Sequence, residues 1–371
     1  MNMIYNKLRV VNIVGARPNF VKIAPIMQAM LQSEKIEPIL LHTGQHYDYE
    51  MSESFFKELS IPEPDVYLEV GSNTHAKQVA TIMEKFDDYL DTTHIDMVLV
   101  VGDVNSTMAC TIVAAKRGIK VVHVEAGIRS WDRTMPEEIN RMVTDSIADI
   151  LMPPSMDAVE NLKKEGHDDS KIHMVGNIMI DTLIHQQANI DRSEILQKLG
   201  LEKREYALLT LHRPSNVDQI ADLSQIMDAI EQIQKQIKVV FPVHPRTRKM
   251  LDKFNLTSKI ESFDKLILTN PLGYHDFGKL VRESCFVMTD SGGIQEETTV
   301  YQIPCITLRA NTERPITITQ GTSELAASKK EVIVKFAGQI LNGDWKKGSI
   351  PDLWDGKTAG RIVEILENFM D

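Results

Sequence analysis

The 371-residue chain has few cysteines, no excess of positive charge and no long hydrophobic run. Its three cysteines (Cys110, Cys285 and Cys305) lie in apolar contexts without CxxC spacing. This favours buried thiols in a reducing compartment over a disulfide or a metal site. The formal net charge of −11 argues against nonspecific binding to nucleic acid. No apolar run approaches the ~20 residues that a membrane span requires, so we expect no membrane partner.

Three further features are missing from the sequence. The start of the chain is polar and leads directly into a predicted strand, so we expect no signal peptide and a cytoplasmic protein. No GxGxxG follows that first strand, which argues against a nicotinamide-dependent dehydrogenase. We find no short-period repeat and no low-complexity tract. Hydrophobic residues make up 43% and charged residues 25%, as is ordinary for a globular enzyme.

Short apolar runs alternate with helical segments along the whole chain. In the first half we predict strands at Val10–Val14, Ile39–His42, Met97–Val101, Lys120–Val124, Ile150–Met152 and Ile172–Val175. The helices predicted between them are Phe20–Leu31, Ala76–Leu90, Thr107–Lys116 and Glu137–Ala148. Continuous apolar strands indicate a parallel sheet covered on both faces, and the intervening helices indicate βαβ units.

The pattern then restarts after a polar, helical segment that resembles a linker. The second set of predicted strands is Tyr206–Leu211, Val239–Val243, Leu266–Leu268, Phe286–Thr289 and Pro304–Leu308. Its predicted helices are Leu223–Gln236, His275–Arg282 and Ile294–Tyr301. We therefore predict an α/β protein with two Rossmann-like parallel-sheet domains, 1–177 and 178–355, hinged near residue 177. The last helix, in 356–371, is expected to pack back on the first domain.

Ligands bind at the carboxyl ends of the strands in open α/β sheets, so the residues that follow the strands are the candidates. The first strand is followed by Gly-Ala-Arg-Pro-Asn, with Arg17 in the turn and Lys22 in the next helix. Cations near a helix N-terminus oppose the helix dipole. The pair therefore favours anion binding over two solvated side chains.

Acidic residues follow the next central strands. Asp103 follows the third predicted strand and Glu125 ends the fourth, while Glu137 begins a helix. Asp103 alone would be read as a helix N-cap, and Glu137 alone as an ordinary dipole partner. Three carboxylates near one another raise each other's pKa, which supplies a proton donor near neutral pH. We predict that they form the catalytic cluster.

The second half repeats the arrangement with residues suited to a nucleotide. His212 follows its first strand, where a phosphate contact or proton transfer competes with a capping role. Ser291, Gly292 and Gly293 form a strand-to-helix turn at which the backbone can approach a phosphate. Glu297 lies one turn into that helix, where a carboxylate can bind a ribose. After the last core strand, the sequence has a further acid, Glu313, followed by Arg314.

These motifs, in chain order, are GARPNFVK, TGQH, GDVNST, HVEAGIRS, PEEINR, LHRPSN, PVHPRT, TDSGGIQEE and NTERP. The set resembles the non-hydrolysing UDP-N-acetylglucosamine 2-epimerases along nearly the whole chain. The resemblance implies a glycosyltransferase-B-type fold, with the two domains facing across a cleft, and a homodimer. It implies interconversion of UDP-GlcNAc and UDP-ManNAc, for surface polysaccharide precursors, without a cofactor or a required metal.

The resemblance also implies roles for the candidate residues. In the family's mechanism UDP is eliminated to leave a bound 2-acetamidoglucal and is then re-added with the opposite configuration at C2. Asp103, Glu125 and Glu137 match the acids of this step, and His212 matches a histidine near the diphosphate. The positions that match UDP-sugar binding are Arg17, Lys22, Ser291, Gly292, Gly293, Glu297 and Arg314.

The chain departs from the family pattern in places that leave further functions open. GARPNF stands where many members have GTRPE, and the family's HRRE is His212-Arg213-Pro214-Ser215. Activation by a second substrate molecule, which in some members involves this region and the Gln45-His46 segment, is therefore not expected. GARPNF and TGQHYD also resemble epimerases of UDP-2,3-diacetamido sugars. The sequence is compatible as well with a hydrolysing epimerase that releases ManNAc, a UDP-sugar glycosyltransferase or a non-catalytic binding module.

Overall fold

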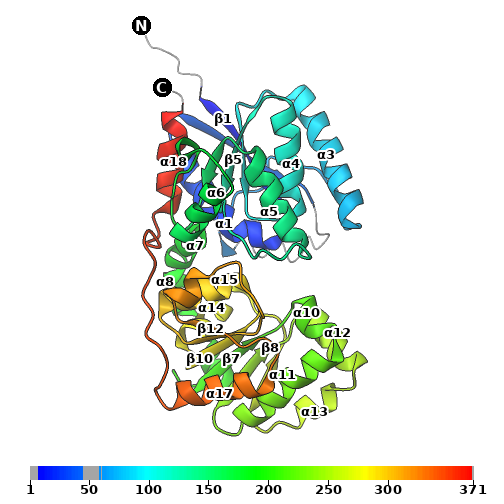
Figure 1. The fold of residues 1–371 in the computed structure, drawn as a ribbon, viewed down its shortest axis with the longest axis vertical. Coiled ribbons are helices and arrows are strands. Elements are labelled where there is room, and N and C mark those ends of the chain that lie inside the picture. The colour runs from blue at the N-terminus through cyan, green and yellow to red at the C-terminus, as the bar shows by residue number, and fades with distance from the viewer. Residues whose placement is uncertain (1–6, 45–57, 60, 370–371) are drawn as a thin grey trace. The chain divides into compact units, whose positions relative to one another are not determined.

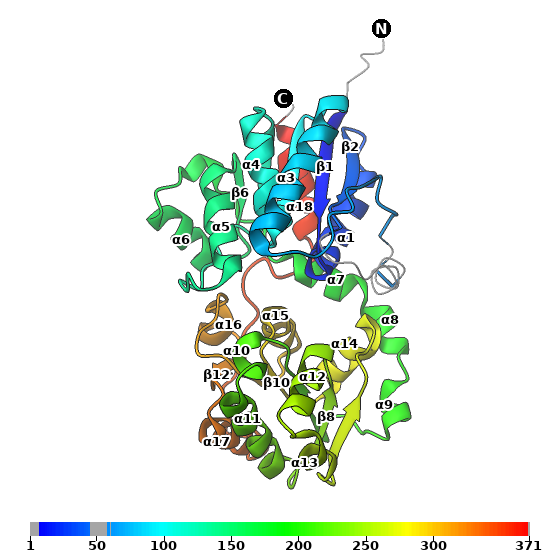
Figure 2. The same ribbon diagram turned by 90° about the vertical axis from the view of Figure 1, so that its right-hand side faces the viewer.

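The chain folds into two α/β units, which are described one at a time (Figures 1 and 2). The structure, a computed structural model, describes residues 7–44, 58–59 and 61–369, without the side chains of residues 17 and 18. Unit 1 contains residues 1–185 and 352–371, and unit 2 contains residues 186–351. The chain therefore returns to unit 1 after unit 2 has been completed.

Unit 1 is built on a six-stranded sheet whose paired strands are all parallel. Its strands are β1 (Leu8–Val14), β2 (Ile36–His42), β3 (Val66–Tyr67), β4 (Met97–Val101), β5 (Lys120–Val124) and β6 (Ile150–Met152). Their order across the sheet is β3-β2-β1-β4-β5-β6. The direction of growth therefore reverses between β1 and β4, which is the topological switch point of a doubly wound fold.

Helices cover both faces of this sheet. They are α1 (Arg17–Leu31), α3 (His75–Thr92), α4 (Asn105–Lys116), α5 (Pro136–Ile147), α6 (Met156–Lys164), α7 (Ile178–His185) and α18 (Thr358–Asn368), with a 3₁₀ turn at Asp169–Lys171. One core packs α3 and α4 on the sheet through residues such as Phe86 and Val113. The helices α1, α7 and α18 pack on one another and bury Phe20 and Leu366.

Unit 2 repeats the topology of unit 1. Its parallel strands are β7 (Tyr206–Thr210), β8 (Lys238–Pro242), β9 (Leu266–Thr269), β10 (Phe286–Thr289), β11 (Cys305–Thr307) and β12 (Ser323–Leu325). Their order is β12-β11-β10-β7-β8-β9, so its switch point lies between β7 and β10. At that point Thr210 lies opposite Thr289, and their hydroxyls hydrogen-bond at 2.7 Å.

The helices of unit 2 again lie on two faces. They are α8 (Gln187–Arg192), α9 (Ile195–Leu199), α10 (Pro214–Val217), α11 (Ile220–Ile233), α12 (Pro245–Lys253), α13 (Thr257–Glu261), α14 (Tyr274–Glu283), α15 (Gly292–Tyr301), α16 (Ile316–Thr319) and α17 (Lys330–Leu341). Successive residues of β7 point into opposite cores: Ala207 and Leu209 into one, Tyr206 and Leu208 into the other. Burial on both faces explains why the strands read as continuous apolar runs.

The predicted fold class is confirmed, with two differences in detail. The strand predicted at Ile172–Val175 is wrong, because only a single bridge forms there, between Leu151 and Ile172. The short edge strands β3 and β12 were not predicted, since two or three residues leave no periodic pattern. The last helix, α18, contacts α1 and α7 of unit 1.

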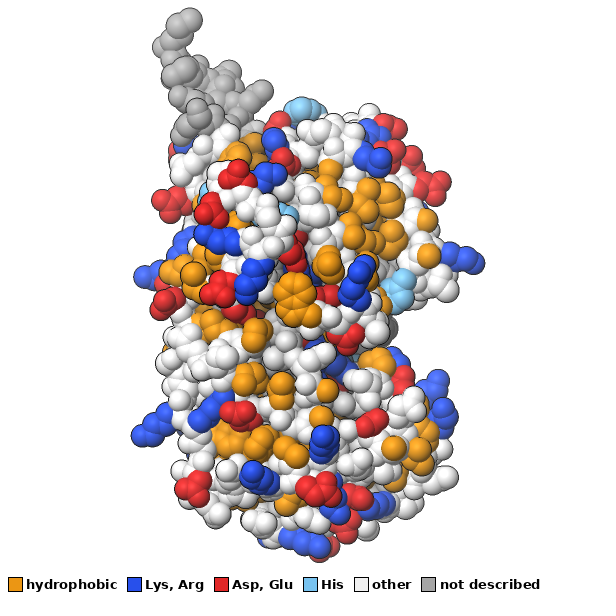
Figure 3. Space-filling view, viewed as in Figure 1, with side chains coloured by type: hydrophobic (Ala, Val, Ile, Leu, Met, Phe, Trp, Pro, Cys, Tyr) orange, Lys and Arg blue, Asp and Glu red, His pale blue; other side chains and the backbone are white. Residues whose placement is uncertain are grey.

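On the face drawn in Figure 3, acidic and basic side chains are interspersed, and neither sign dominates an area. No helix in the described part of the chain is long and apolar enough to cross a membrane.

Candidate functional site

Most of the predicted site residues follow strands that lie at or next to the two switch points, whereas Glu137 begins α5. In unit 1 they follow β1, β4 and β5, and in unit 2 they follow β7, β10 and β11. Where neighbouring parallel strands end together, their outgoing turns diverge and leave room for a ligand. Each unit has one such place of its own.

The turn after β1 is shaped by small and amide side chains. Asn19 Oδ1 accepts hydrogen bonds from the amides of Gly15 and Ala16 at 3.2 Å, and its Nδ2 donates to the Val101 carbonyl at 2.8 Å. A Cβ on Gly15 would lie 2.1 Å from Ser106 Oγ, so only glycine fits. Asn19, which departs from the family pattern, therefore ties the ends of β1 and β4 together.

Three of the residues considered from the sequence cannot be placed fully. Arg17 begins α1, but its side chain lies outside the described part of the structure. Gln45 and His46 fall entirely outside the described residues.

A buried ion pair links the end of β5 to α1. Lys22 Nζ donates a hydrogen bond to Glu125 Oε2, and both side chains are more than nine-tenths buried. Glu125 has a φ of 75°, in the left-handed region that non-glycine residues rarely occupy. A Cβ on Gly102 would lie 2.9 Å from Lys22 Nζ and 3.2 Å from Glu125 Oε2, so the turn after β4 runs directly against the pair. Strained residues of this kind concentrate at functional sites.

Asp103 lies beside this pair on the neighbouring strand end and has a cation of its own. Its Oδ2 accepts a hydrogen bond from Arg141 on α5, whose Nη2 lies 2.6 Å from Glu138 Oε2. Glu138 is fully buried and also accepts from the amides of Ser130 and Trp131. Burial alone would raise the pKa of Glu138, but these amides and Arg141 outweigh it and lower that pKa. Asp103 is not the N-cap of α4, which is Val104.

Glu137 has a different environment from the other two predicted acids. It lies in the first turn of α5, and its side chain is exposed. Within the described residues its carboxylate makes no hydrogen bond and no ion pair. Asp103 and Glu125 thus each have a cationic partner. The sequence analysis expected instead that their main neighbours would be other carboxylates.

In unit 2, His212 is held by an acid that sequence reasoning missed. His212 Nδ1 lies 2.9 Å from Asp290 Oδ1, while the amides of His212 and Arg213 donate to the same carboxylate. Burial alone would raise the pKa of Asp290, but His212 and these amides outweigh it and hold the pKa low. Asp290 therefore orients an imidazole whose side chain is 42% exposed, an arrangement suited to proton transfer.

The glycine turn after β10 leads into α15 as predicted. Ser291 is the N-cap residue, but its side chain makes no capping hydrogen bond. Gly292 and Gly293 begin the helix, so their amides lie at its positive end, where phosphates bind. A Cβ on Gly292 would lie 2.7 Å from Arg314 Nη1, so glycine is needed for the arginine to reach the turn.

Three arginines converge on Glu313 next to this turn. Its carboxylate lies 2.8 Å from Arg314, 2.6 Å from Arg309 and 3.3 Å from Arg213. Arg314 also lies 2.7 Å from Glu296. Three guanidinium groups thus lie next to the positive end of α15, an arrangement that favours an anion there although the chain is acidic as a whole.

Glu297 lies within α15 in a buried position without a cation. Only 7% of the residue is exposed, and within the described residues its carboxylate makes no hydrogen bond and no ion pair. Burial, together with the charge of Glu296, raises the pKa of Glu297 to about 8. The carboxyl group is therefore largely protonated at neutral pH, when it can both donate and accept a hydrogen bond.

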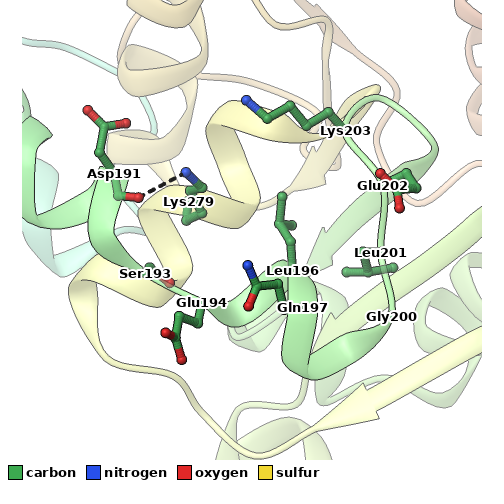
Figure 4. Close-up of a pocket in the computed structure, with 10 residues that line it drawn as sticks. All are labelled: Asp191, Ser193, Glu194, Leu196, Gln197, Gly200, Leu201, Glu202, Lys203 and Lys279. Atoms are coloured by element: carbon green, nitrogen blue, oxygen red, sulfur yellow. Dashed lines mark hydrogen bonds between the residues drawn. The ribbon is translucent and has the colours of Figure 1, made fainter.

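A separate cavity of about 460 Å³ in unit 2 lies away from these residues (Figure 4). Ten residues line it: Asp191, Ser193, Glu194, Leu196, Gln197, Gly200, Leu201, Glu202, Lys203 and Lys279. Most of them precede β7, so the cavity lies beside the amino-terminal end of that strand. Lys279 donates to the Asp191 carbonyl at 3.3 Å across it. None of the residues that line this cavity belongs to the candidate site.

The partners that complete both clusters are residues to which sequence reasoning assigned no role. They are Glu138, Arg141, Asp290, Glu296, Arg309 and Glu313. All six stand within or next to the motifs quoted for the family, which was the signal available for finding them. Among the described residues, no group of three or more histidine, cysteine or acidic side chains could hold a metal ion.

Known proteins resemble this chain over nearly its whole length. The sequence model of a family described as UDP-N-acetylglucosamine 2-epimerase matches residues 28–367. A UDP-N-acetylglucosamine 2-epimerase homolog of Methanococcus maripaludis is 42% identical, covering 97% of this chain and 100% of the relative. A UDP-2,3-diacetamido-2,3-dideoxy-D-glucuronate 2-epimerase of Pseudomonas aeruginosa is 36% identical, covering 97% and 99%.

The fold of this chain is also similar to that of a solved structure. The crystal structure of the Methanocaldococcus jannaschii UDP-GlcNAc 2-epimerase, in complex with UDP-GlcNAc and UDP, has a TM-score of 0.89 to this chain. It is 38% identical in sequence, and the match covers 97% of this chain and 100% of that structure.

Proposed function

This chain belongs to the UDP-N-acetylglucosamine 2-epimerase family, and we propose that it interconverts UDP-GlcNAc and UDP-ManNAc without hydrolysis. The observation that carries the proposal is the pairing of Glu125 and Lys22 against the Gly102–Asp103 turn. A buried carboxylate on a strained residue, beside a second carboxylate, provides the groups that proton transfer at C2 requires.

We assign the UDP moiety to unit 2. The diphosphate is placed at the N-terminus of α15, near Gly292, Gly293, Ser291 and Arg314, where amides and a guanidinium supply donors. Glu297, one turn further along the helix, is assigned to the ribose hydroxyls. The solved relative from Methanocaldococcus jannaschii, which is in complex with UDP-GlcNAc and UDP, supports this choice of ligand.

We assign proton transfer to Asp103, Glu125 and Glu137 of unit 1. In the elimination the C2–H bond breaks and its electrons form the C1=C2 bond, while the C1–O bond breaks and UDP leaves. Re-addition reverses these changes with the proton delivered to the other face of C2. Inversion therefore requires proton-transfer groups on two faces, which a single carboxylate does not supply.

His212 is assigned to the leaving diphosphate, because Asp290 fixes its Nδ1 and the ring is partly exposed. The C2 proton is a weak acid, so stabilisation of the departing UDP lowers most of the barrier. Arg17 and Lys22 are assigned to the same ligand, and Lys22 is also paired with Glu125. No step in this scheme involves a nicotinamide cofactor or a metal ion.

Proton NMR of UDP-GlcNAc incubated with the protein in heavy water tests the reaction. We expect UDP-ManNAc to appear with deuterium at C2, because the base exchanges its proton with solvent. Epimerised product that retains full protium at C2 would contradict the elimination. Free ManNAc together with UDP would instead identify a hydrolysing epimerase, and unchanged UDP-GlcNAc would contradict both.

A second substrate is favoured by one specific observation, the 36% identity to the Pseudomonas aeruginosa enzyme that is named for a UDP-2,3-diacetamido uronic acid. The two substrates differ in the group at C3 and in the carboxylate at C6. Comparison of kcat/KM for UDP-GlcNAc and for the diacetamido uronic acid decides between them. A higher value for the diacetamido substrate would replace the proposed substrate but keep the reaction.

The setting of the reaction is also a proposal. The three cysteines are free thiols, which is typical of a reducing compartment such as the cytoplasm. The family resemblance implies a homodimer and a product used for surface polysaccharides. Analytical ultracentrifugation tests the dimer, and a single species with the mass of one chain would contradict it.

A further inference from the structure

A fully buried histidine, His123, lies on β5 two residues before Glu125. Its Nδ1 lies 2.5 Å from Asp145 Oδ1, and its Nε2 lies 2.8 Å from the Gly102 carbonyl oxygen. Both ring nitrogens therefore face oxygen atoms. The histidine connects α5, which carries Asp145, to the turn that precedes Asp103.

The two oxygen partners determine where the protons are. A carbonyl oxygen only accepts, so Nε2 must carry a proton. Asp145 Oδ2 accepts a hydrogen bond from the Gly127 amide at 3.0 Å and lies 2.7 Å from Arg129 Nη2, and both contacts favour the carboxylate form. An ionised Asp145 also only accepts, so Nδ1 must carry a proton as well. The ring is then an imidazolium.

The charges of the surrounding groups agree with this assignment. The side chains of His123, Asp145 and Arg129 are fully buried, and Arg129 also binds Glu165 at 2.6 and 2.7 Å. An imidazolium and Arg129 together balance Asp145 and Glu165, and Glu165 is the member of the group that reaches solvent, with 23% of its side chain exposed.

We propose that His123 is a positioning residue, held as an imidazolium by Asp145, that fixes the Gly102 carbonyl and thereby the turn carrying Asp103. Gly102 has a φ of 72°, and its Cα faces Lys22 and Glu125. The peptide plane that contains the Gly102 oxygen also contains the Asp103 amide, so its orientation sets the direction of Asp103. His123 thus aligns the two carboxylates without contacting the substrate, a role that rests on the proposed function.

The protonation state can be measured without any variant. In protein labelled with ¹⁵N-histidine, NMR should show both ring nitrogens of His123 protonated at neutral pH, and the signal is assigned by its loss in His123→Gln. A neutral tautomer under these conditions would overturn the proposal. This result does not depend on catalysis, so failure of the proposed epimerase activity would be recognised separately.

The positioning role is tested by comparing two amide substitutions. The amide nitrogen of Gln reaches the position of Nε2 and can donate to Gly102, whereas that of Asn reaches only the position of Nδ1. We expect His123→Asn to lower kcat by roughly 10- to 100-fold through misplacement of the acids, with KM and UDP affinity retained. His123→Gln should recover much of the loss.

Equal kcat values in His123→Asn and the wild type would overturn the positioning role, as would an unrecovered loss in a folded His123→Gln. If neither variant folds, Asp145→Asn replaces them, since it removes the charge that holds the second proton. In that protein the His123 ring should become a neutral tautomer. A ring that stays doubly protonated would show that Asp145 does not hold the imidazolium.

Discussion

The two units share one strand order but differ in the chemistry at their switch points. In unit 1 the acids at the strand ends are paired with cations, Glu125 with Lys22 and Asp103 with Arg141. In unit 2 arginines gather at the glycine turn, while Glu297 is buried without a cation within the described residues. The same topology therefore supplies two strand-end turns with different side chains, and the proposed function assigns one to proton transfer and the other to an anion.

This difference predicts that the two units respond to substitution in separate ways. Loss of an acid in unit 1 should slow turnover and leave UDP binding intact. Loss of a cation in unit 2 should weaken UDP binding. The expected effects decrease in size from turnover, through UDP binding, to stability.

The largest effect is expected from the acids of unit 1. Glu137→Gln, Glu125→Gln and Asp103→Asn should each lower kcat by ~10²–10⁴, as is typical for loss of an acid or base. UDP affinity, measured by calorimetry, should match the wild type. Glu160→Gln, an exposed position on α6, is the matched control and should have normal kcat.

Stability separates the variants further. Glu125→Gln leaves Lys22 buried without its charged partner and should lower the melting temperature, whereas the exposed Glu137 has no ion pair to lose within the described residues. A Glu137→Gln protein that is stable, slow and binds UDP normally would therefore assign Glu137 to the chemistry. If the acid variants fail to bind UDP, the proposed division between the units is wrong.

The next effect is expected in UDP binding to unit 2. Arg314→Ala removes a guanidinium beside Gly292 and should weaken UDP binding by about 10- to 100-fold, the value of a hydrogen bond to a charged group. Arg314→Lys should fall in between, because lysine keeps the charge but loses the planar fork. Titration calorimetry measures both.

Arg246→Ala is the control for this arginine, because Arg246 pairs with Asp218 on the surface of the same unit. It should bind UDP normally. Equal UDP affinities for Arg314→Ala and the wild type would remove Arg314 from the nucleotide site, even if turnover were slower.

The sequence was sufficient for the fold class and for the elements that carry the site. Alternating apolar strands and helices reveal two doubly wound halves, and parallel strands place their outgoing turns at one edge. The order of the strands across each sheet could not be predicted from the sequence, because it depends on long-range pairing. The switch points between β1 and β4 and between β7 and β10 become visible only in the structure.

The partners of the site residues were unpredictable for a similar reason. Arg141 reaches Asp103 across 38 positions of sequence, and Asp290 reaches His212 across 78. No local pattern connects such residues, since their meeting depends on how α5 packs in unit 1 and on β7 pairing with β10. Sequence reasoning thus found Asp103, Glu125 and Lys22, but not Arg141 or Asp290.

A smaller effect concerns the dependence of stability on pH. The pKa of Glu297 is raised to about 8, so the folded protein binds a proton that the unfolded chain loses at a lower pH. This contribution to stability is fully present below the unfolded pKa and is lost as pH rises towards 8. Between pH 6 and pH 7 the loss should approach about 1 kcal/mol in the free energy of unfolding.

Urea unfolding of Glu297→Gln at the two pH values tests this, because the neutral amide cannot titrate and should remove that part of the dependence. Glu202→Gln, an exposed glutamate of the same unit, should keep the wild-type slope. A slope in Glu297→Gln that equals the wild-type slope would mean that Glu297 is ionised in the folded protein. Burial without a cation would then not keep this carboxyl group protonated.

The smallest effect concerns the return of the chain to unit 1. Asp181 on α7 is buried and accepts hydrogen bonds from the amides of Thr358 and Ala359, at 3.1 and 2.8 Å, at the start of α18. Asp181→Asn keeps the shape but removes the charge that complements the helix dipole, so it should cost about 1 kcal/mol. Because α18 contacts α1 and α7, the loss should appear as faster hydrogen exchange in these three helices. Amides of α11 and α17, in the core of unit 2, should exchange at the wild-type rate. Faster exchange in both units would show that the last helix stabilises the whole chain, and the units could then no longer be treated as separate in stability.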